Sequence, residues 1–254
     1  EWLGAKGDGS TDNATTLQQW LNSLGNGLVA RLAGGTYNTA SEITVPGNFK
    51  FVAVHGQGSK IKYTGASSSA SVLNFNSTGG YKSTFSMLTL DANSAAGYAL
   101  KFTSPGGTFS NTALRFIDCL FVNALTVNVQ MGDYSTTTRD YDIANTVFDG
   151  CIFQGPTGSV NVVVDALNIV NVAFRNTAFG YVSTSSLPTW NARLLTGATA
   201  TFDTCFFDRV SKPGYAVYNK GVLATFHGCD TETCRFLWQE ATTDLVNLST
   251  TVRG

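Results

Sequence analysis

The chain has 254 residues, a formal net charge of −1, 13% charged residues and 43% hydrophobic residues. It contains no run of Lys and Arg, which argues against nucleic acids and anionic membranes as partners. It also contains no run of about 18 apolar residues, so no membrane-spanning helix is expected. A single domain is expected, because β-structures of about 200–250 residues often fold as one unit.

The first predicted element is a short helix over residues 14–24. Leu17, Trp20, Leu21 and Leu24 stand at i, i+3, i+4 and i+7, which places them on one apolar face. If the strands that follow stack on one another, the stack has an open end with unpaired edges, and a helix laid over that end would cap it. We therefore expect Trp20 in the core of the cap and not on a sugar-binding surface.

Short strands are expected after the helix. Runs rich in Val, Ile, Phe and Tyr are bounded by Gly, Asn and Asp, which is typical of strands and turns. The expected strands cover residues 28–32, 43–45, 49–54, 60–63, 72–75, 85–91 and 98–102.

Five segments further along the chain repeat one pattern. They read FIDCLF, FDGCIF, FRNTAF, FDTCFF and FHGCDT, and their first residues are Phe116, Phe148, Phe174, Phe202 and Phe226. The intervals between these residues are 32, 26, 28 and 24 by subtraction. Recurrence at a period of about 20–50 residues is typical of stacked repeats, so each segment is interpreted as one coil of a solenoid.

Position within the repeat predicts orientation. The first residue, the fourth (Cys119, Cys151, Thr177, Cys205, Cys229) and the sixth are expected to point inward and to stack on their equivalents about 4.8 Å away. The third residue is mostly a turn former, so a bend is expected there. The stacked cysteines are interpreted as free, buried thiols, with Cys234 outside the column. A second strand per coil is expected over residues 125–130, 160–165, 192–195 and 216–218.

The N-terminal third carries a family resemblance. GAKGDGSTDN (residues 4–13) leads into the helix, and AGGTY (residues 33–37) and HGQG (residues 55–58) follow. These motifs resemble the pectate-lyase-like superfamily, in particular its phage tailspike and depolymerase branch. Asn13 departs from the resemblance, since a second Asp is more usual there.

The resemblance implies an all-β fold, a single right-handed parallel β-helix with an N-terminal capping α-helix. The entry segment and cap would occupy residues 1–27, and the β-helix residues 28–254, as one structural domain. A bacterial surface polysaccharide is the implied partner, a homotrimer the implied assembly, and a virion tail appendage or another extracellular location the implied setting. No signal peptide is recognised in this chain, and no cofactor or metal is expected.

The candidate catalytic residues are carboxylates, because the chain has two His and no Ser-His-Asp, phosphate-loop or metal motif. The seventh repeat position is expected to face water, and it places Asp208 and Glu232 on neighbouring coils as an acid and a base. Arg209 could bridge them or contact substrate. The second position alternates in charge (Ile117, Asp149, Arg175, Asp203, His227), which is interpreted as ion pairs between coils.

Two loops offer further candidates. The insertion over residues 131–142 supplies Asp140 and Asp142 as alternative catalytic carboxylates, and acids beside aromatic rings suit a sugar site. Its substrate-contacting candidates are Asp133, Tyr134, Arg139 and Tyr141. Tyr181 and Trp190, the latter in a loop expected over residues 183–191, complete the set. Asp91 is interpreted as a structural turn residue.

Three functions remain open from the sequence. A hydrolase would use two carboxylates. A polysaccharide lyase would need a Tyr or Lys base and a cation that neutralises a uronate, with Arg139, Arg175, Arg193 and Arg209 as candidates. A non-catalytic receptor-binding or structural domain of a phage-like appendage would need neither a carboxylate pair nor a base with a neutralising cation.

Overall fold

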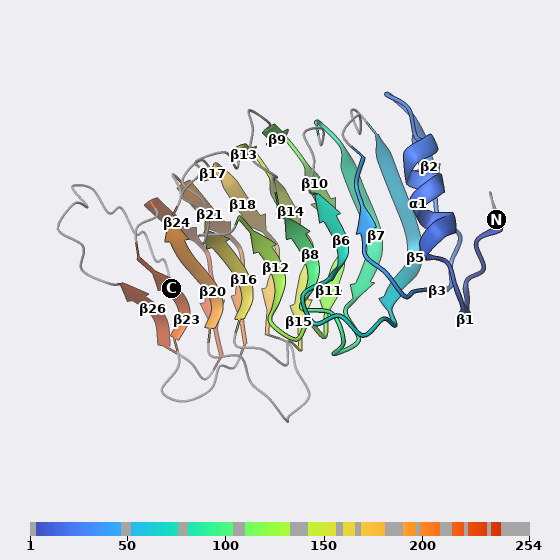
Figure 1. Ribbon diagram of the computed structural model, residues 1–254. Helices are drawn as coiled ribbons and strands as arrows, with labels where there is room; N and C mark the ends of the chain where they lie inside the picture. The colour runs from blue at the N-terminus through green and yellow to red at the C-terminus, as the bar shows by residue number, and fades with distance from the viewer. Residues whose placement is uncertain are drawn as a thin grey trace.

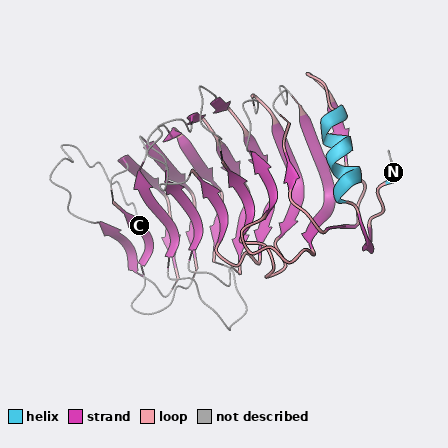
Figure 2. Ribbon diagram, viewed as in Figure 1, coloured by secondary structure: helices cyan, strands magenta, loops and turns pink. Residues whose placement is uncertain are grey.

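The computed structural model describes residues 4–46, 52–75, 81–103, 110–132, 142–155, 160–165, 169–180, 190–196, 199–208, 215–220, 223–232 and 235–239. In these ranges the chain forms one α-helix, α1 (Ala14–Ser23), and 26 β-strands. The strands pair in parallel and stack into a column of coils, with α1 lying across its N-terminal end (Figures 1 and 2). The expectation of a parallel β-helix with a capping helix is confirmed.

The largest sheet, sheet A, has 15 strands and two arms. The first arm contains β10 (Arg115–Ile117), β14 (Val147–Asp149), β18 (Val172–Arg175), β21 (Thr199–Asp203) and β24 (Leu223–His227). The second arm contains β11 (Leu120–Val122), β15 (Ile152–Gln154), β19 (Ala178–Phe179), β22 (Phe206–Phe207) and β25 (Asp230–Thr231). The long strand β7 (Thr84–Asp91) pairs with β10 through its first half and with β11 through its second half. The N-terminal strands complete this sheet: β1 (Asp8–Asp12), β2 (Val29–Arg31), β3 (Thr36–Thr39) and β5 (Ala53–Tyr63).

The bend between the two arms lies where the repeat predicts it. The third repeat position has a positive φ in all five coils, at Asp118 (51°), Gly150 (63°), Asn176 (48°), Thr204 (54°) and Gly228 (57°). Left-handed backbone favours Gly and Asn, which explains the residue types found there.

A sixth coil carries the same bend. Phe85 pairs in register with Phe116, and Met87, two residues later, has a φ of 54°. A strand was expected here over residues 85–91, and the segment stood outside the five-membered repeat because Leu88 and Leu90 stand where later coils have Cys and Phe.

Phenylalanine rings form the core in two columns. The first repeat position stacks from Phe85 to Phe226, with ring centroids 4.9–5.4 Å apart and planes within 13°. The sixth position stacks Phe121, Phe153, Phe179 and Phe207 at 4.9–5.1 Å. The predicted inward columns are therefore confirmed, and each coil buries its rings against the next, as neighbour interfaces in solenoids do.

The fourth repeat position forms a hydrogen-bonded column. Cys119, Cys151 and Cys205 are buried free thiols, as predicted. Cys229 is also a free thiol, but it is half-buried, which differs from the prediction. Each Sγ donates to the carbonyl two residues earlier and to the carbonyl of the Phe one coil back. Thr177 Oγ1 makes the same two bonds, so Cys and Thr are equivalent here.

Two further sheets lie beside sheet A in the described residues, one of eight strands and one of three. Sheet B contains β4 (Ile43–Thr44), β6 (Ser71–Phe75), β8 (Tyr98–Phe102), β12 (Val127–Met131), β16 (Val160–Asp165), β20 (Trp190–Thr196), β23 (Tyr215–Asn219) and β26 (Arg235–Gln239). The small sheet C contains β9 (Ser110–Thr112), β13 (Asp142–Ala144) and β17 (Ile169–Val170), none of which the sequence predicted. The strands expected at 49–54 and 60–63 are parts of the single strand β5 in the described range.

The cap helix buries the predicted face. Leu17, Trp20, Leu21 and Leu24 all belong to the same hydrophobic core as the coils. Asn13 stands where the resembled family more often has Asp, and its side-chain amide is fully hydrogen-bonded. Nδ2 donates to the carbonyls of Lys6 and Thr11, while Oδ1 accepts from Lys6 N–H. An ionised Asp could not donate these bonds.

Candidate functional site

Most loop candidates lie outside the described residues. This holds for Asp133, Tyr134, Arg139, Asp140, Tyr141, Tyr181 and Arg209. Asp142 begins β13, where its backbone pairs with Ser110 in sheet C. Trp190 begins strand β20, so its expected placement in a loop is wrong.

Asp208 and Glu232 occupy equivalent positions on neighbouring coils, as predicted. Their backbone N–H groups donate to the carbonyls of Phe179 and Phe207, the preceding members of one inward column. Their surroundings differ, because Asp208 is 9% exposed while Glu232 is exposed. The expectation that this repeat position faces water is therefore wrong for Asp208, and Val122 in the same column is buried as well.

A buried side chain contacts the Asp208 backbone. Asn191 Nδ2 donates to the Asp208 carbonyl at 2.8 Å, and Asn191 is itself buried. The simple alternation of inward and outward residues therefore does not extend to the seventh position.

The alternating column of the second repeat position faces outward, but the expected ion pairs are not formed. Asp149, Arg175, Asp203 and His227 follow one another in register on four coils of the first arm. The ion pair found within 4 Å among the described residues lies elsewhere, between Lys60 and Asp91. The charges of the column are thus not neutralised by direct pairing between coils.

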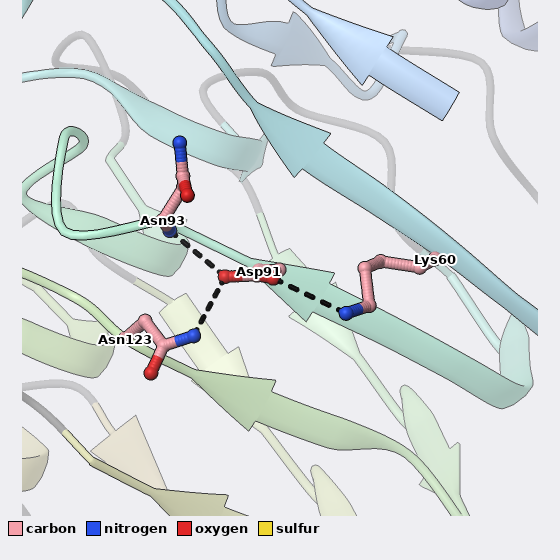
Figure 3. A network of polar contacts seen from close by, with 4 residues as sticks. All are labelled: Lys60, Asp91, Asn93 and Asn123. Atoms are coloured by element: carbon pink, nitrogen blue, oxygen red, sulfur yellow. Dashed lines mark hydrogen bonds and ion pairs between the residues drawn. The ribbon is translucent and has the colours of Figure 1, made fainter. Parts of the chain in front are cut away.

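The Lys60–Asp91 ion pair belongs to a structural corner, shown in Figure 3. Asp91 Oδ1 accepts hydrogen bonds of 2.9 Å from Asn93 N–H and from Asn123 Nδ2 on the next coil, and Oδ2 lies 3.4 Å from Lys60 Nζ. Asp91 is buried, and its bonds hold the turn closed. These contacts agree with its interpretation as a turn residue.

The outer face of sheet B carries a groove of about 260 Å³. Its described lining residues are Tyr98, Lys101, Thr126, Val127, Gln130, Gly132, Val160, Val163, Arg193 and Leu195. We call it the sheet-B groove. Its floor is apolar, since Val127, Val160 and Val163 form a buried cluster separate from the main core. Tyr98 and Trp190 pack against this cluster from the coils at either end.

Cations stand over aromatic rings at both ends of the groove. Lys101 Nζ lies 4.6 Å from the ring centroid of Tyr98, and Arg193 Cζ lies 5.8 Å from that of Tyr218. Trp190 and Tyr218 are themselves 5.1 Å apart. Lys101 and Arg193 are separated by three coils, roughly 14 Å along the axis. The groove thus combines apolar and aromatic surface with positive charge.

Sequence reasoning named Arg193 and Trp190 but missed Tyr98, Lys101, Gln130 and Tyr218. Aligning the second strand of each coil would have found them, because Lys101, Gln130, Val163 and Arg193 are register partners. The Phe repeat drew attention to sheet A, and no comparably invariant residue marks sheet B.

The described residues contain no group of three or more His, Cys, Asp or Glu that could hold a metal ion. Within the same residues, no helix is long and apolar enough to cross a membrane.

Comparison of the fold with solved structures gives a match to a viral protein. ORF18 of Geobacillus virus E2 aligns with 91% of this chain at a TM-score of 0.56 and 19% identity. The chain shares its parallel β-helix fold with this viral protein. It spans 52% of the length of that viral protein, about half. No family model and no curated protein matches the sequence.

Two weaker similarities involve other phage proteins. The first is pre-mature gene product 12 of bacteriophage phi29. The alignment covers 92% of this chain and 33% of the phi29 chain, at a TM-score of 0.49 and 14% identity. The second is the phiAB6 tailspike, whose structure is in complex with oligosaccharides of Acinetobacter baumannii surface polysaccharide. The alignment covers 93% of this chain and 46% of the tailspike chain, at a TM-score of 0.37 and 14% identity.

Proposed function

We propose that this chain is the polysaccharide-binding domain of a phage-type surface appendage, and that it binds and hydrolyses a bacterial surface polysaccharide. The observation that carries the proposal is the sheet-B groove. Its valine floor and Tyr98 offer apolar surface to the faces of sugar rings, and Trp190 packs against that floor at the end next to Val160. The similarity of the fold to a viral protein supports the setting on a virion.

An acidic polysaccharide fits the groove better than a neutral one. Lys101 and Arg193 both lie in the lining, and Arg binds carboxylates with two parallel hydrogen bonds. A chain of uronate sugars lying along the axis would meet a cation at each end of the groove and apolar surface between them.

Elimination by a lyase is the alternative within the enzyme class. It needs a base and a neutralising cation at the same sugar, and Tyr98 beside Lys101 and Tyr218 beside Arg193 are pairs of that kind. Hydrolysis with two carboxylates is the proposed reaction, and Asp208 with Glu232, Asp140 and Asp142 are its candidates from the sequence. Product analysis separates the two reactions, because a lyase leaves an unsaturated sugar that absorbs in the near ultraviolet and a hydrolase leaves a plain reducing end.

A purely binding role is the second candidate function. It is favoured by the composition of the groove, since none of its described lining residues is a carboxylate. The two functions differ in one observable, which is whether the bound glycan becomes shorter.

We further propose a homotrimer, as the tailspike resemblance implies. Sedimentation equilibrium checks this, because a chain of 27.0 kDa would give a species of three times that mass. A single species at the monomer mass would refute the trimer for this chain.

Binding to purified bacterial capsular polysaccharides, uronate-containing and neutral, tests the function. Arg193→Gln should weaken binding of the uronate-containing glycan at least about tenfold, because a charge-assisted hydrogen bond contributes roughly 1.5–3 kcal/mol. Trp190→Ala should weaken binding of all ligands. The matched control is Arg31→Gln on β2, which removes a cation far from the groove. If the wild-type protein binds none of these glycans, or both groove variants bind like the control, the proposal is wrong.

A further inference from the structure

One outward column of sheet B carries a cation at each end of the sheet-B groove and no charge between the two cations. Its members are Lys101, Gln130, Val163 and Arg193, register partners on the strands β8, β12, β16 and β20, which lie side by side in Figure 1. All four side chains line the groove. We call them the groove column. Along the solenoid axis, the groove column offers a cation, an amide, an apolar side chain and a second cation.

The two cations are not neutralised by carboxylates in the described part of the chain. There, neither Lys101 nor Arg193 forms an ion pair within 4 Å, and the described lining of the groove contains no carboxylate. Both side chains are half-buried, so an anionic group of a ligand would meet each of them partly shielded from water, where opposite charges attract more strongly. The groove column therefore favours negative charge at its two ends.

The distance between the two cations is set by the solenoid. Their backbones are three coils apart, roughly 14 Å at about 4.8 Å per coil. The Lys101 ammonium lies over the ring of Tyr98 in its own coil. The Arg193 guanidinium lies over Tyr218, one coil further from Lys101. The aromatic contacts thus keep the two charges at the ends of the groove column and do not draw them together.

The coils also match the length of a sugar. In an extended glycan, one pyranose sugar advances the chain by about one coil spacing, roughly 5 Å. Four consecutive sugars lying along the axis would therefore each lie over one member of the groove column. The first and fourth sugars would meet the two cations. Carboxylates on adjacent or alternate sugars, about 5 or 10 Å apart, are too close together to reach both.

The two middle members differ in what they can accept. Gln130 Nε2 donates to the Gly132 carbonyl at 2.6 Å, which holds the amide in place, and its Oε1 can accept a hydrogen bond from a sugar hydroxyl. Val163 belongs to the apolar floor with Val127 and Val160, which suits a sugar face or a methyl group. A carboxylate over either residue would lose water without meeting a cation, which is costly.

We propose that the groove column selects acidic polysaccharides in which every third sugar carries a carboxylate, as in a trisaccharide repeat with one uronate. The inference rests on the proposed function, because it takes the sheet-B groove to be the binding site. It adds the spacing of the charges and the order of the sugars between them, with a polar sugar over Gln130 and an apolar face or methyl group over Val163.

Four-sugar probes of equal charge test the spacing. Tetragalacturonic acid has one carboxyl group per sugar, and methyl esterification of two of them gives isomers with free carboxylates on the first and fourth, first and third, or first and second sugars. Calorimetric titration of the full chain should show the first-and-fourth isomer binding at least about tenfold more tightly than the first-and-second isomer. That is the factor expected for one charge-assisted hydrogen bond, because only the first-and-fourth isomer reaches both cations.

Moving one cation by a single coil tests the groove column from the protein side. Lys101→Gln combined with Gln130→Lys exchanges the two side chains, keeps the net charge and places the cations two coils apart, about 10 Å. The first-and-third isomer should then bind most tightly. The matched control is Lys101→Arg, which keeps a cation on β8 and should keep the preference for the first-and-fourth isomer. Urea unfolding checks that both variants fold like the wild type.

Three results would overturn the proposal. Equal binding of the three isomers by the wild-type protein would mean that the groove does not measure charge spacing. An unchanged preference in the exchange variant would place recognition outside the groove column. Binding of capsular polysaccharides without binding of any isomer would also contradict the proposal, while leaving the proposed function intact. If the wild-type protein binds neither the isomers nor any capsular polysaccharide, the proposed function itself fails.

Discussion

Asn161 Nδ2 lies 2.9 Å from Asn191 Oδ1 on the next coil, inside the solenoid and away from water. Asn161 Oδ1 in turn accepts a 2.9 Å bond from Asn128 Nδ2 one coil earlier. The row ends where Asn191 donates to the Asp208 carbonyl. Because buried polar groups are costly unless they are bonded, each amide of this asparagine row depends on its neighbours.

The asparagine row predicts the effect of Asn161→Asp. The carboxylate can still accept from Asn128 but cannot donate to Asn191 Oδ1, and its charge is buried. We expect a loss of about 2–4 kcal/mol in the free energy of unfolding at pH 7, measured by urea denaturation.

The loss should depend on pH. Burial raises the pKa of the introduced carboxyl group, so its deficit is smallest below the ordinary aspartate pKa of about 3.9 and grows as the pH rises above it. Asn22→Asp on the exposed side of α1 is the control and should change stability little at either pH. A deficit that is equal at pH 3.5 and pH 7 would contradict a charge-based cause.

The core was largely predictable from the sequence, because its side chains recur at fixed repeat positions. Phe116, Phe148 and Phe174 mark the coils, and the bends at Asp118 and Gly150 follow from residue type and position alone. Stacking converts one repeat into a column, so a local pattern is enough to place these residues.

The surface was harder to predict, since it depends on how strands of different coils align. Asp208 was expected in water, but it is buried and its carbonyl accepts a hydrogen bond from the asparagine row. The sheet-B groove joins Tyr98 to Arg193, which are 95 positions apart by subtraction and share no motif. The row at Asp149 and Arg175 was recognised, but its ion pairs could not be judged without side-chain distances.

Thr177 tests what the thiol column contributes. Its hydroxyl donates at 2.7 Å to the Arg175 carbonyl and at 3.3 Å to the Phe148 carbonyl, and the cysteines of the column bond in the same way. Thr177→Cys should therefore leave stability within about 0.5 kcal/mol. The shape-matched Thr177→Val lacks the donor and should cost about 1 kcal/mol in urea unfolding. Equal stability of the two variants would mean that the column acts only by filling space.

Cys229 should be the reactive member of the column. The Cys205 thiol can turn from the backbone carbonyls and donate to the Cys229 thiolate, which lowers the pKa of Cys229 to about 7, whereas this same bond and burial raise the pKa of Cys205. Because the thiolate is the nucleophile, alkylation of half-buried Cys229 by iodoacetamide should reach half its maximal rate near pH 7. Cys205 should stay unmodified in the folded protein.

Removing the neighbour separates the two causes. Cys205→Ala takes away the donor, so the half-maximal point for Cys229 should move upward toward the ordinary cysteine value of about 8.5. Peptide mapping by mass spectrometry follows each cysteine individually. An unchanged profile in Cys205→Ala would show that the Cys205 thiol does not set the reactivity of Cys229.

Glu232→Gln and Asp208→Asn test the carboxylate pair that the sequence predicted. Glu232 is exposed, while its neighbour Asp208 is 9% exposed. Because an acid pair needs both carboxyl groups at the substrate, we expect both variants to release reducing ends from a bound capsular polysaccharide within about twofold of the wild-type rate. Urea unfolding should also be unchanged for Glu232→Gln, since an exposed substitution of the same shape alters stability by less than about 0.5 kcal/mol. A hundredfold loss in either variant would contradict this expectation and restore Asp208 and Glu232 as the acid pair.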